Sequence, residues 1–146
     1  MHRCTFFGHR DTPEWVSVPL KKEIIKLIEE RNVYCFYVGN QGNYDTMVIR
    51  TLRELKNKYQ NITYYIVLAY FPTDKDKNIT NNYCTVFPEE LANVPRRFAI
   101  DKRNNWMLQQ SDYVISYVTH KIGGASKFTE KAIKKGKQVI NLANNE

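Results

Sequence analysis

Short apolar runs separated by longer mixed segments are the main pattern along this chain. Five runs have the length and composition of β-strands, at residues 4–7, 33–38, 62–70, 113–118 and 139–142, and a weaker one lies at 84–87. The runs are continuously apolar rather than alternating, which is typical of strands covered by helices on both faces. The pattern therefore predicts a sheet buried between two layers of helices.

The segments between the runs carry apolar residues at helical spacing. The first helix follows Pro19, a residue suited to a first helical turn. The apolar positions are Leu20, Ile24, Leu27 and Ile28 in this helix and Val48, Leu52, Leu55 and Tyr59 in the second. Two further helices are expected at 96–110 and 126–135, the last closed by Gly136 as its C-terminal cap. Residues 71–95 are polar and interrupted by prolines, so we expect a long irregular connection that covers a site.

This alternation of strands and helices is typical of one fold class. It predicts an α/β fold: a single Rossmann-like three-layer domain with a mostly parallel sheet of five or six strands and helices on both faces. A chain of 146 residues has the size of one domain, so we expect residues 1–146 to form it alone.

Composition excludes several classes of protein. Hydrophobic residues make up 42% and charged residues 25%, as in ordinary globular domains. No apolar run approaches the ~20 residues of a membrane span, and the N-terminus does not resemble a signal peptide. Three cysteines and three histidines, without a CxxC pair or ligand spacing, favour reduced, buried thiols over a zinc site. We therefore expect a cytoplasmic protein with no membrane partner, no metal and no cofactor.

The net charge of +7 and the isoelectric point near 9.3 indicate a surface that attracts anions. Lysines are concentrated in the C-terminal third, where Glu130 is the acidic residue among them. They are Lys121, Lys127, Lys131, Lys134, Lys135 and Lys137. A solvated helix face and an anion-binding surface both explain such a row.

The glycines indicate where a ligand would bind. Of the six glycines, all but Gly136 follow a predicted strand, in the loops GHRDT, GNQGNYD and HKIGGAS. The carboxyl ends of parallel strands meet at one edge of a sheet, beside the N-termini of the following helices. Glycine allows close approach of the backbone, and helix N-termini favour phosphate. The three loops therefore predict one pocket, although neither GxGxxG nor GxxxxGK[ST] occurs.

Several polar and aromatic side chains have both a binding and a structural interpretation. Arg10 and His9 have the chemistry to bind phosphate, or else brace their loop. Asn40, Asn43 and Asp45 suit ribose hydroxyls as well as a turn and a helix cap. The aromatic candidates for stacking a base are Trp106, Tyr44 and Tyr83, of which Trp106 is also a candidate for the core.

Longer stretches resemble the SLOG superfamily of Rossmann-like proteins, and within it the YpsA-like and YoqJ-like branch. The matching pieces are FFGHR at 6–10, GNQGNYD at 39–45, VPRRFAIDKRNNWM at 94–107, SDYVISY at 111–117 and GGASKFTEKAIKKGKQVINL at 123–142. The resemblance implies a single nucleotide-binding α/β domain, in a family that includes enzymes, DNA-binding proteins and sensors of nucleotide signals.

The related LOG phosphoribohydrolases cleave the N-glycosidic bond of a nucleoside monophosphate, and their motifs are partly present. Arg103 and Met107 match RxxxM, and Gly123, Gly124 and Glu130 match PGGxGTxxE. The departures from the second motif are Ile122, Ser126 and Lys127, in place of proline, glycine and threonine. The resemblance thus implies phosphate binding more strongly than catalysis, with Arg103 and Glu130 as the catalytic candidates.

Both charges also have structural explanations. A buried Arg103 needs an anionic partner, which is either a ligand phosphate or a carboxylate such as Asp112. Glu130, placed in the first turn of the last helix, would be stabilised by the helix dipole alone. The full expected ligand-binding set is Gly8, His9, Arg10, Asp11, Gly39, Asn40, Gln41, Gly42, Asp45, Arg103, Asn104, Gly123, Gly124, Ala125 and Ser126.

Three functions follow, in order of preference. The first is binding of a nucleotide or nucleotide-derived, ADP-ribose-like ligand at the strand ends, as a sensor or sequestering protein. The second is hydrolysis or transfer at an N-glycosidic bond, with Glu130 as the catalytic carboxylate. The third is binding of single-stranded nucleic acid along the lysine-rich face. A homo-oligomer is compatible with all three.

Overall fold

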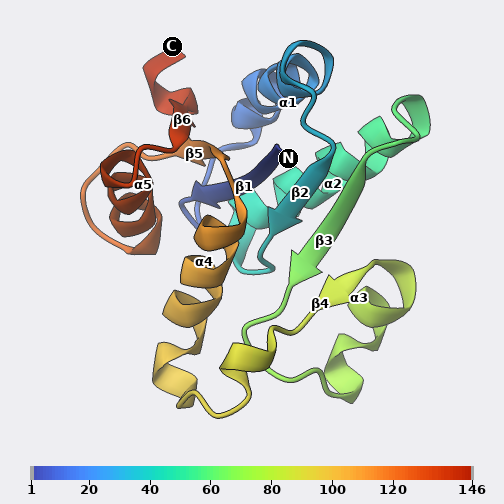
Figure 1. The fold of residues 1–146 in the computed structure, drawn as a ribbon, viewed down its shortest axis with the longest axis vertical. Helices are drawn as coiled ribbons and strands as arrows, with labels where there is room; N and C mark the ends of the chain where they lie inside the picture. The colour runs from blue at the N-terminus through green and yellow to red at the C-terminus, as the bar shows by residue number, and fades with distance from the viewer. Residues whose placement is uncertain (1, 146) are drawn as a thin grey trace.

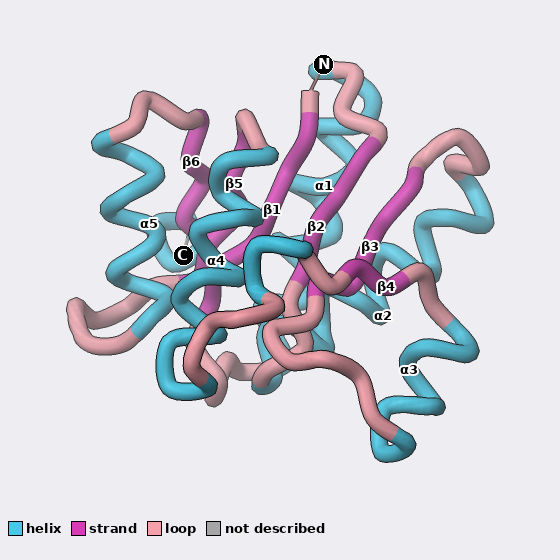
Figure 2. The backbone as a smooth tube through the Cα atoms, turned by 60° about the horizontal axis from the view of Figure 1, so that its bottom comes forward, coloured by secondary structure: helices cyan, strands magenta, loops and turns pink. Residues whose placement is uncertain are grey.

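The computed structural model describes residues 2–145, which form one parallel six-stranded sheet covered by helices (Figures 1 and 2). The strand order is β4-β3-β2-β1-β5-β6, and every neighbouring pair is parallel. The strands are β1 (Arg3–Gly8), β2 (Cys35–Val38), β3 (Thr63–Val67), β4 (Thr85–Val86), β5 (Tyr113–Tyr117) and β6 (Gln138–Asn141). The predicted Rossmann-like α/β fold is confirmed.

Helices cover both faces of this sheet. They are α1 (Ser17–Arg31), α2 (Gly42–Lys58), α3 (Lys77–Asn82), α4 (Ala99–Gln110) and α5 (Gly124–Lys134). In Figure 2, α4 and α5 lie in front of the strands and α1 and α2 behind them, whereas α3 extends beyond the edge strand β4. Each face has its own apolar core, and adjacent residues of β1 divide between them: Phe6 packs in the α1 and α2 core, and Phe7 packs in the α4 and α5 core.

The predicted elements appear with shifted ends. The run at 62–70 leaves the sheet after Val67, and the helix expected at 126–135 begins two residues earlier, at Gly124. Gly136 closes α5 with a φ of +77°, while its N–H and that of Lys137 donate to Ile133 and Ala132. The expected cap is therefore confirmed.

Residues 71–95 contain more regular structure than we expected. A 3-10 turn and α3 precede β4, and a further 3-10 turn at Glu89–Leu91 follows it. The weaker strand run at 84–87 is confirmed as β4, to which the Ile66 and Leu68 N–H groups of the β3 side bond. The helix α3 was not predicted, because the Thr73 cap that precedes it is not visible from hydrophobic periodicity.

Residues 2–145 contain no helix long and apolar enough to cross a membrane, and no group of histidine, cysteine and acidic residues with a geometry suited to a metal ion. The three cysteines are free, but only Cys4 is buried, whereas Cys35 is half-buried and Cys84 is exposed. The prediction of buried thiols was therefore wrong for Cys84, which precedes the half-buried edge strand β4.

Candidate functional site

One cavity lies where the carboxyl ends of β1 and its neighbours meet α4 and the N-terminus of α5. We call it the strand-end cavity, and its volume is about 410 Å³. Sheet order changes direction at β1, which pairs with β2 on one side and with the much later β5 on the other. The lining residues are Phe6, Phe7, Gly8, His9, Arg10, Gln41, Asp45, Ile100, Asp101, Arg103, Asn104, Met107, Gly123, Gly124 and Ala125.

The glycines of the first two loops meet protein atoms rather than open space. A Cβ on Gly8 would lie 2.1 Å from Cγ of Tyr44, a ring buried beneath β1 whose hydroxyl donates to the Ile115 carbonyl at 2.8 Å. Gly42 has a φ of +87° and lies against the Arg10 backbone. These two glycines are therefore explained by packing, and Tyr44 is a core residue without access to a base.

The third loop is different. Gly123 has a φ of +102°, and a Cβ built on either Gly123 or Gly124 would meet no atom within 4 Å. Both glycines are exposed, and both line the strand-end cavity together with Ala125, at the start of α5. This loop presents an open backbone and a helix N-terminus to a ligand.

Arg103 is buried, with 2% of its surface exposed, and it joins three parts of the cavity wall. Its Nη1 donates to the Val67 carbonyl at 3.0 Å, its Nη2 to the Gln41 side chain at 2.7 Å, and its Nε to Oδ1 of Asn104 at 2.9 Å. Asp112, the carboxylate named as an alternative structural partner, instead accepts a hydrogen bond from the Arg3 backbone N–H. That alternative was wrong for Asp112 because the Arg103 guanidinium points toward β3 and the Gln41 loop.

Asp45 is the carboxylate whose negative charge acts on Arg103. Its Oδ2 accepts the Gln41 backbone N–H at 2.9 Å, at the start of α2. Burial raises the pKa of Asp45 to about 6, although the positive charge of Arg103 opposes the shift. Burial lowers the pKa of Arg103, and Asp45 opposes that change in turn. Each group thus keeps the other charged in a place where water solvates neither well.

His9 is held by the loop that follows β5. The Thr119 N–H donates to its Nε2 at 3.0 Å, and its ring stacks on His120 with centroids 3.9 Å apart. Burial, and then the proximity of His120, lower the pKa of His9. His9 therefore accepts a hydrogen bond from its own chain through Nε2 in the neutral state. Arg10 lines the cavity with an exposed side chain.

A second surface begins at the same first turn of α5. Ser126, Lys127, Glu130, Lys131 and Lys134 of α5 line a groove of about 330 Å³ with Lys121 of the preceding loop, and we call it the lysine groove. Lys127 pairs with Asp101 of the strand-end cavity at 2.7 Å, so the two sites are neighbours. The charges in the cavity itself are balanced, since Asp45 and Asp101 face Arg10 and Arg103.

The structure separates the residues that we expected in one pocket. Glu130 is exposed in the middle of α5, not in its first turn, and it lines the lysine groove with Ser126. The two catalytic candidates, Arg103 and Glu130, therefore line different sites. Asp11, Gly39 and Gly42 are outside the cavity lining as well.

Asn40 and Gln41, adjacent in sequence, line different cavities. Asn40 belongs to a smaller cavity of about 180 Å³ at the carboxyl ends of β2 and β3, which we call the β2–β3 cavity. Gln41 is extended, with a φ of −119° and a ψ of 116°, and successive side chains of extended backbone point to opposite sides.

Four lining residues on α4 form a pattern that sequence reasoning used only in part. Ile100, Arg103, Asn104 and Met107 follow the i, i+3, i+4, i+7 spacing of one helix face. Once Arg103 was a candidate, this spacing was a sufficient signal for Ile100. Trp106, on a neighbouring face, packs edge-on against Tyr37 and belongs to the core, and Tyr83 packs against Tyr64.

Comparison with known proteins gives a relation in fold. No protein-family model matches the chain, and no curated protein matches it by sequence. Among solved structures, DNA processing protein A from Streptococcus pneumoniae is 17% identical, with a TM-score of 0.68 over 95% of this chain. The same protein from Helicobacter pylori, solved in a study of its single-stranded DNA binding mode, is 13% identical, with a TM-score of 0.64 over 99%. This chain spans 49% of the first protein and 70% of the second.

Proposed function

We propose that this protein binds single-stranded nucleic acid, with DNA as the first candidate, along the lysine groove and across the mouth of the strand-end cavity. One observation carries the proposal: the lysine groove and the cavity share the first turn of α5, where Gly124 and Ala125 face one and Ser126 faces the other. A strand that follows this turn meets a row of cations and then an open helix N-terminus.

The charges of the groove favour a polyanion. Lys121 and Lys134 are exposed and form no ion pair within residues 2–145, while Lys127 is paired with Asp101. Glu130 is the single acidic residue lining the groove in that part of the chain. Backbone phosphates of a strand would interact with several lysines together, and each interaction releases counterions.

The fold relation supports the same partner. Both similar structures are of a DNA processing protein, and one was studied for its binding of single-stranded DNA. At identities of 17% and 13% the TM-scores of 0.68 and 0.64 show the fold alone, so the charged groove of this chain is the independent argument for the partner.

A free nucleotide in the strand-end cavity is the second candidate. The cavity volume of about 410 Å³ lies in the range of small-molecule sites, ~300–1,000 Å³. This function ranks second because the charges lining the cavity cancel, so a multiply charged phosphate gains less there than in the groove. Cleavage of an N-glycosidic bond ranks third, because Glu130 lies outside the cavity lining.

The test is a titration of fluorescently labelled oligonucleotides followed by anisotropy at several salt concentrations. Lys121→Glu/Lys134→Glu reverses two exposed groove charges, and Lys22→Glu/Lys26→Glu makes the same change on α1. We expect the groove variant to bind at least tenfold more weakly and to lose about 0.7 in the salt slope for each lysine that contacts a phosphate. Equal affinities of the groove and α1 variants would refute the proposal.

Mononucleotides in a thermal-shift assay test the second candidate. Saturable stabilisation of the wild-type protein by a mononucleotide, unchanged in the groove variant and without oligonucleotide binding, would reverse the order of the two candidates.

A further inference from the structure

The β2–β3 cavity is a second site on the same edge of the sheet. Its wall comes from Asn40 after β2, from residues 68–71 after β3, and from the segment that follows. Its volume of about 180 Å³ is below the ~300–1,000 Å³ of whole small-molecule sites, so it suits one planar ring system. The Arg103 contacts with Gln41 and the Val67 carbonyl separate it from the strand-end cavity.

Asn40 gives this cavity an unused hydrogen-bonding group. Its Oδ1 is buried and accepts no hydrogen bond from any residue between 2 and 145, and its amide nitrogen makes none within the same range. A buried acceptor without a partner loses its hydration and gains nothing in return. Because a rotation about the Cβ–Cγ bond exchanges the oxygen and nitrogen in nearly the same volume, the amide can turn either an acceptor or a donor toward a ligand.

Aromatic side chains form the other part of the wall. Phe71 is 73% exposed, and its ring stands at 87° to that of Phe87 with centroids 5.6 Å apart, so most of the Phe71 ring is open to solvent. The Arg96 guanidinium lies 4.0 Å from the centre of the Tyr70 ring. An exposed phenyl face and a guanidinium plane are both surfaces on which a nucleobase stacks.

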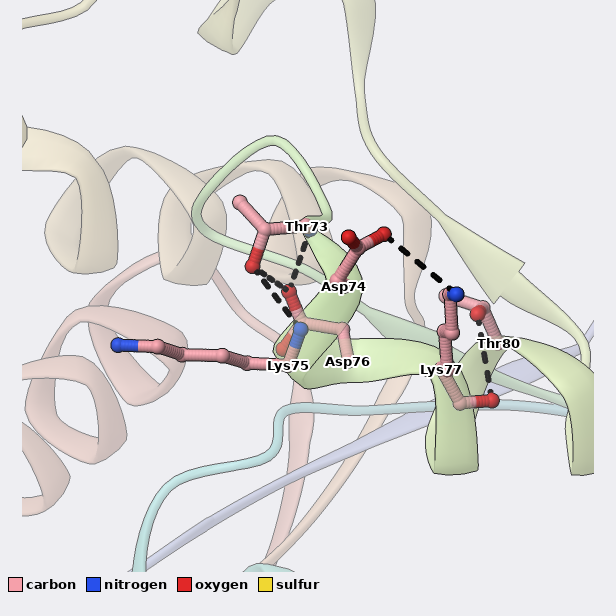
Figure 3. A network of polar contacts seen from close by, with 6 residues as sticks. All are labelled: Thr73, Asp74, Lys75, Asp76, Lys77 and Thr80. Atoms are coloured by element: carbon pink, nitrogen blue, oxygen red, sulfur yellow. Dashed lines mark hydrogen bonds and ion pairs between the residues drawn. The ribbon is translucent and has the colours of Figure 1, made fainter.

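The remaining wall is held by its own hydrogen bonds (Figure 3). Thr73 and Asp76 cap each other, with the Thr73 N–H donating to Asp76 Oδ2 at 2.8 Å, and Lys77 pairs with Asp74 at 3.7 Å. Figure 3 shows the Lys75 side chain pointing away from both carboxylates, and Lys75 forms no ion pair in the described chain. The wall therefore presents an unpaired cation beside the aromatic rings, where a backbone phosphate of a neighbouring nucleotide would pass.

We propose that the β2–β3 cavity takes one nucleobase of the bound strand, and that Asn40 makes adenine the preferred base. This inference rests on the proposed nucleic-acid function and adds base preference to it. The paired donor and acceptor of an asparagine amide match adenine N7 and the N6 amino group, and in the bound state the Asn40 side chain turns so that its buried Oδ1 faces the base. Phe71 contributes stacking that is shared by all bases, and Lys75 contributes charge that is shared by all sequences.

The test compares the affinities of oligo(dA) and oligo(dT) for matched variants, by anisotropy. The ratio of the two affinities isolates the cavity, because both strands share the same phosphates. We expect Asn40→Ala to weaken oligo(dA) binding about tenfold and to leave oligo(dT) within about twofold. Asn81→Ala, an exposed asparagine on α3 outside the cavity, is the control and leaves both affinities unchanged.

Phe71→Ala provides an independent second variant. We expect it to weaken the binding of both oligonucleotides about tenfold, because stacking does not depend on the base. Phe98→Ala, which removes another exposed phenyl ring, is the control and leaves both affinities unchanged. If Asn40→Ala and Phe71→Ala bind both strands as the wild type does while the lysine-groove variant still binds weakly, the base site is refuted and the nucleic-acid function stands. Failure of the wild type to bind either strand refutes both.

Discussion

The strand-end cavity and the β2–β3 cavity share one edge of the sheet but differ in how they are built. The strand-end cavity is made from the core itself: Arg103 is buried, and Gly8 rests on the buried ring of Tyr44. The β2–β3 cavity is made largely from an outlying segment, and its most prominent ring, Phe71, is exposed. The buried residues of the first cavity are therefore needed for folding whatever they bind, whereas the exposed residues of the second are free to serve a ligand alone.

Arg103→Ala gives the largest expected effect and tests whether the strand-end cavity is part of the core. It removes contacts to Val67, Gln41 and Asn104 and leaves Asp45 without the opposing charge. We expect a loss of about 3–5 kcal/mol in the free energy of unfolding, measured by urea denaturation. A loss below about 1 kcal/mol would show that Arg103 serves a ligand and not the fold.

Gly8→Ala tests the contrast between the packed glycine of the first loop and the open glycines of the third loop. The new Cβ would lie 2.1 Å from Cγ of the buried Tyr44 ring, so we expect a loss of about 3 kcal/mol or slightly more. Gly124→Ala is the matched control, because its Cβ meets no atom within 4 Å and its stability should change by less than about 0.5 kcal/mol. Similar losses for both would remove the distinction between packed and open glycines.

The pH dependence of stability tests the buried charge of Asp45. Its pKa is raised from 3.8 to about 6 in the folded state, so the folded protein binds more protons than the unfolded chain between these values. Stability is therefore highest when Asp45 is protonated and falls as the pH rises from about 4 to 6, by roughly 3 kcal/mol at most. The difference between the wild type and Asp45→Asn in urea denaturation isolates this contribution, and a difference that is constant across the window would contradict it.

Phe71→Ala gives the smallest expected effect on stability. Its side chain is 73% exposed, so we expect a change within about 0.5 kcal/mol in the same assay, despite the tenfold effect proposed for binding. A loss of more than about 2 kcal/mol would place Phe71 among the structural residues and remove the contrast between the cavities.

The hydrophobic pattern was sufficient to predict the sheet and its covering helices, because continuous apolar runs and helical spacing are local signals. It was also sufficient to place the glycine loops at one edge. The reasons for individual glycines were not predictable, since the Tyr44 ring reaches Gly8 from another element and the contact exists only in the folded chain.

The separation of the expected site residues into different cavities was also not predictable from the sequence. GNQGNYD is one motif in sequence, but the extended backbone at Gln41 sends Asn40 and Gln41 to different sides. Glu130 was placed beside the other site residues because a motif gives spacing along the chain, whereas the rotation of α5 directs it to the lysine groove. The lysines themselves were predictable as a row, and their proximity to the strand-end cavity was not.

The position of β1 in the middle of the sheet also sets an order of events during synthesis. Its two partners are β2, which follows closely, and β5, which pairs Tyr113 with Cys4 across most of the chain. Until β5, α4 and α5 leave the ribosome, Phe7, Tyr37 and Val67 belong to a core whose other half has not yet been made. The nascent chain therefore exposes one apolar sheet face until α4 and α5 have been made, and completion of α5 buries that face and assembles the lysine groove in the same step.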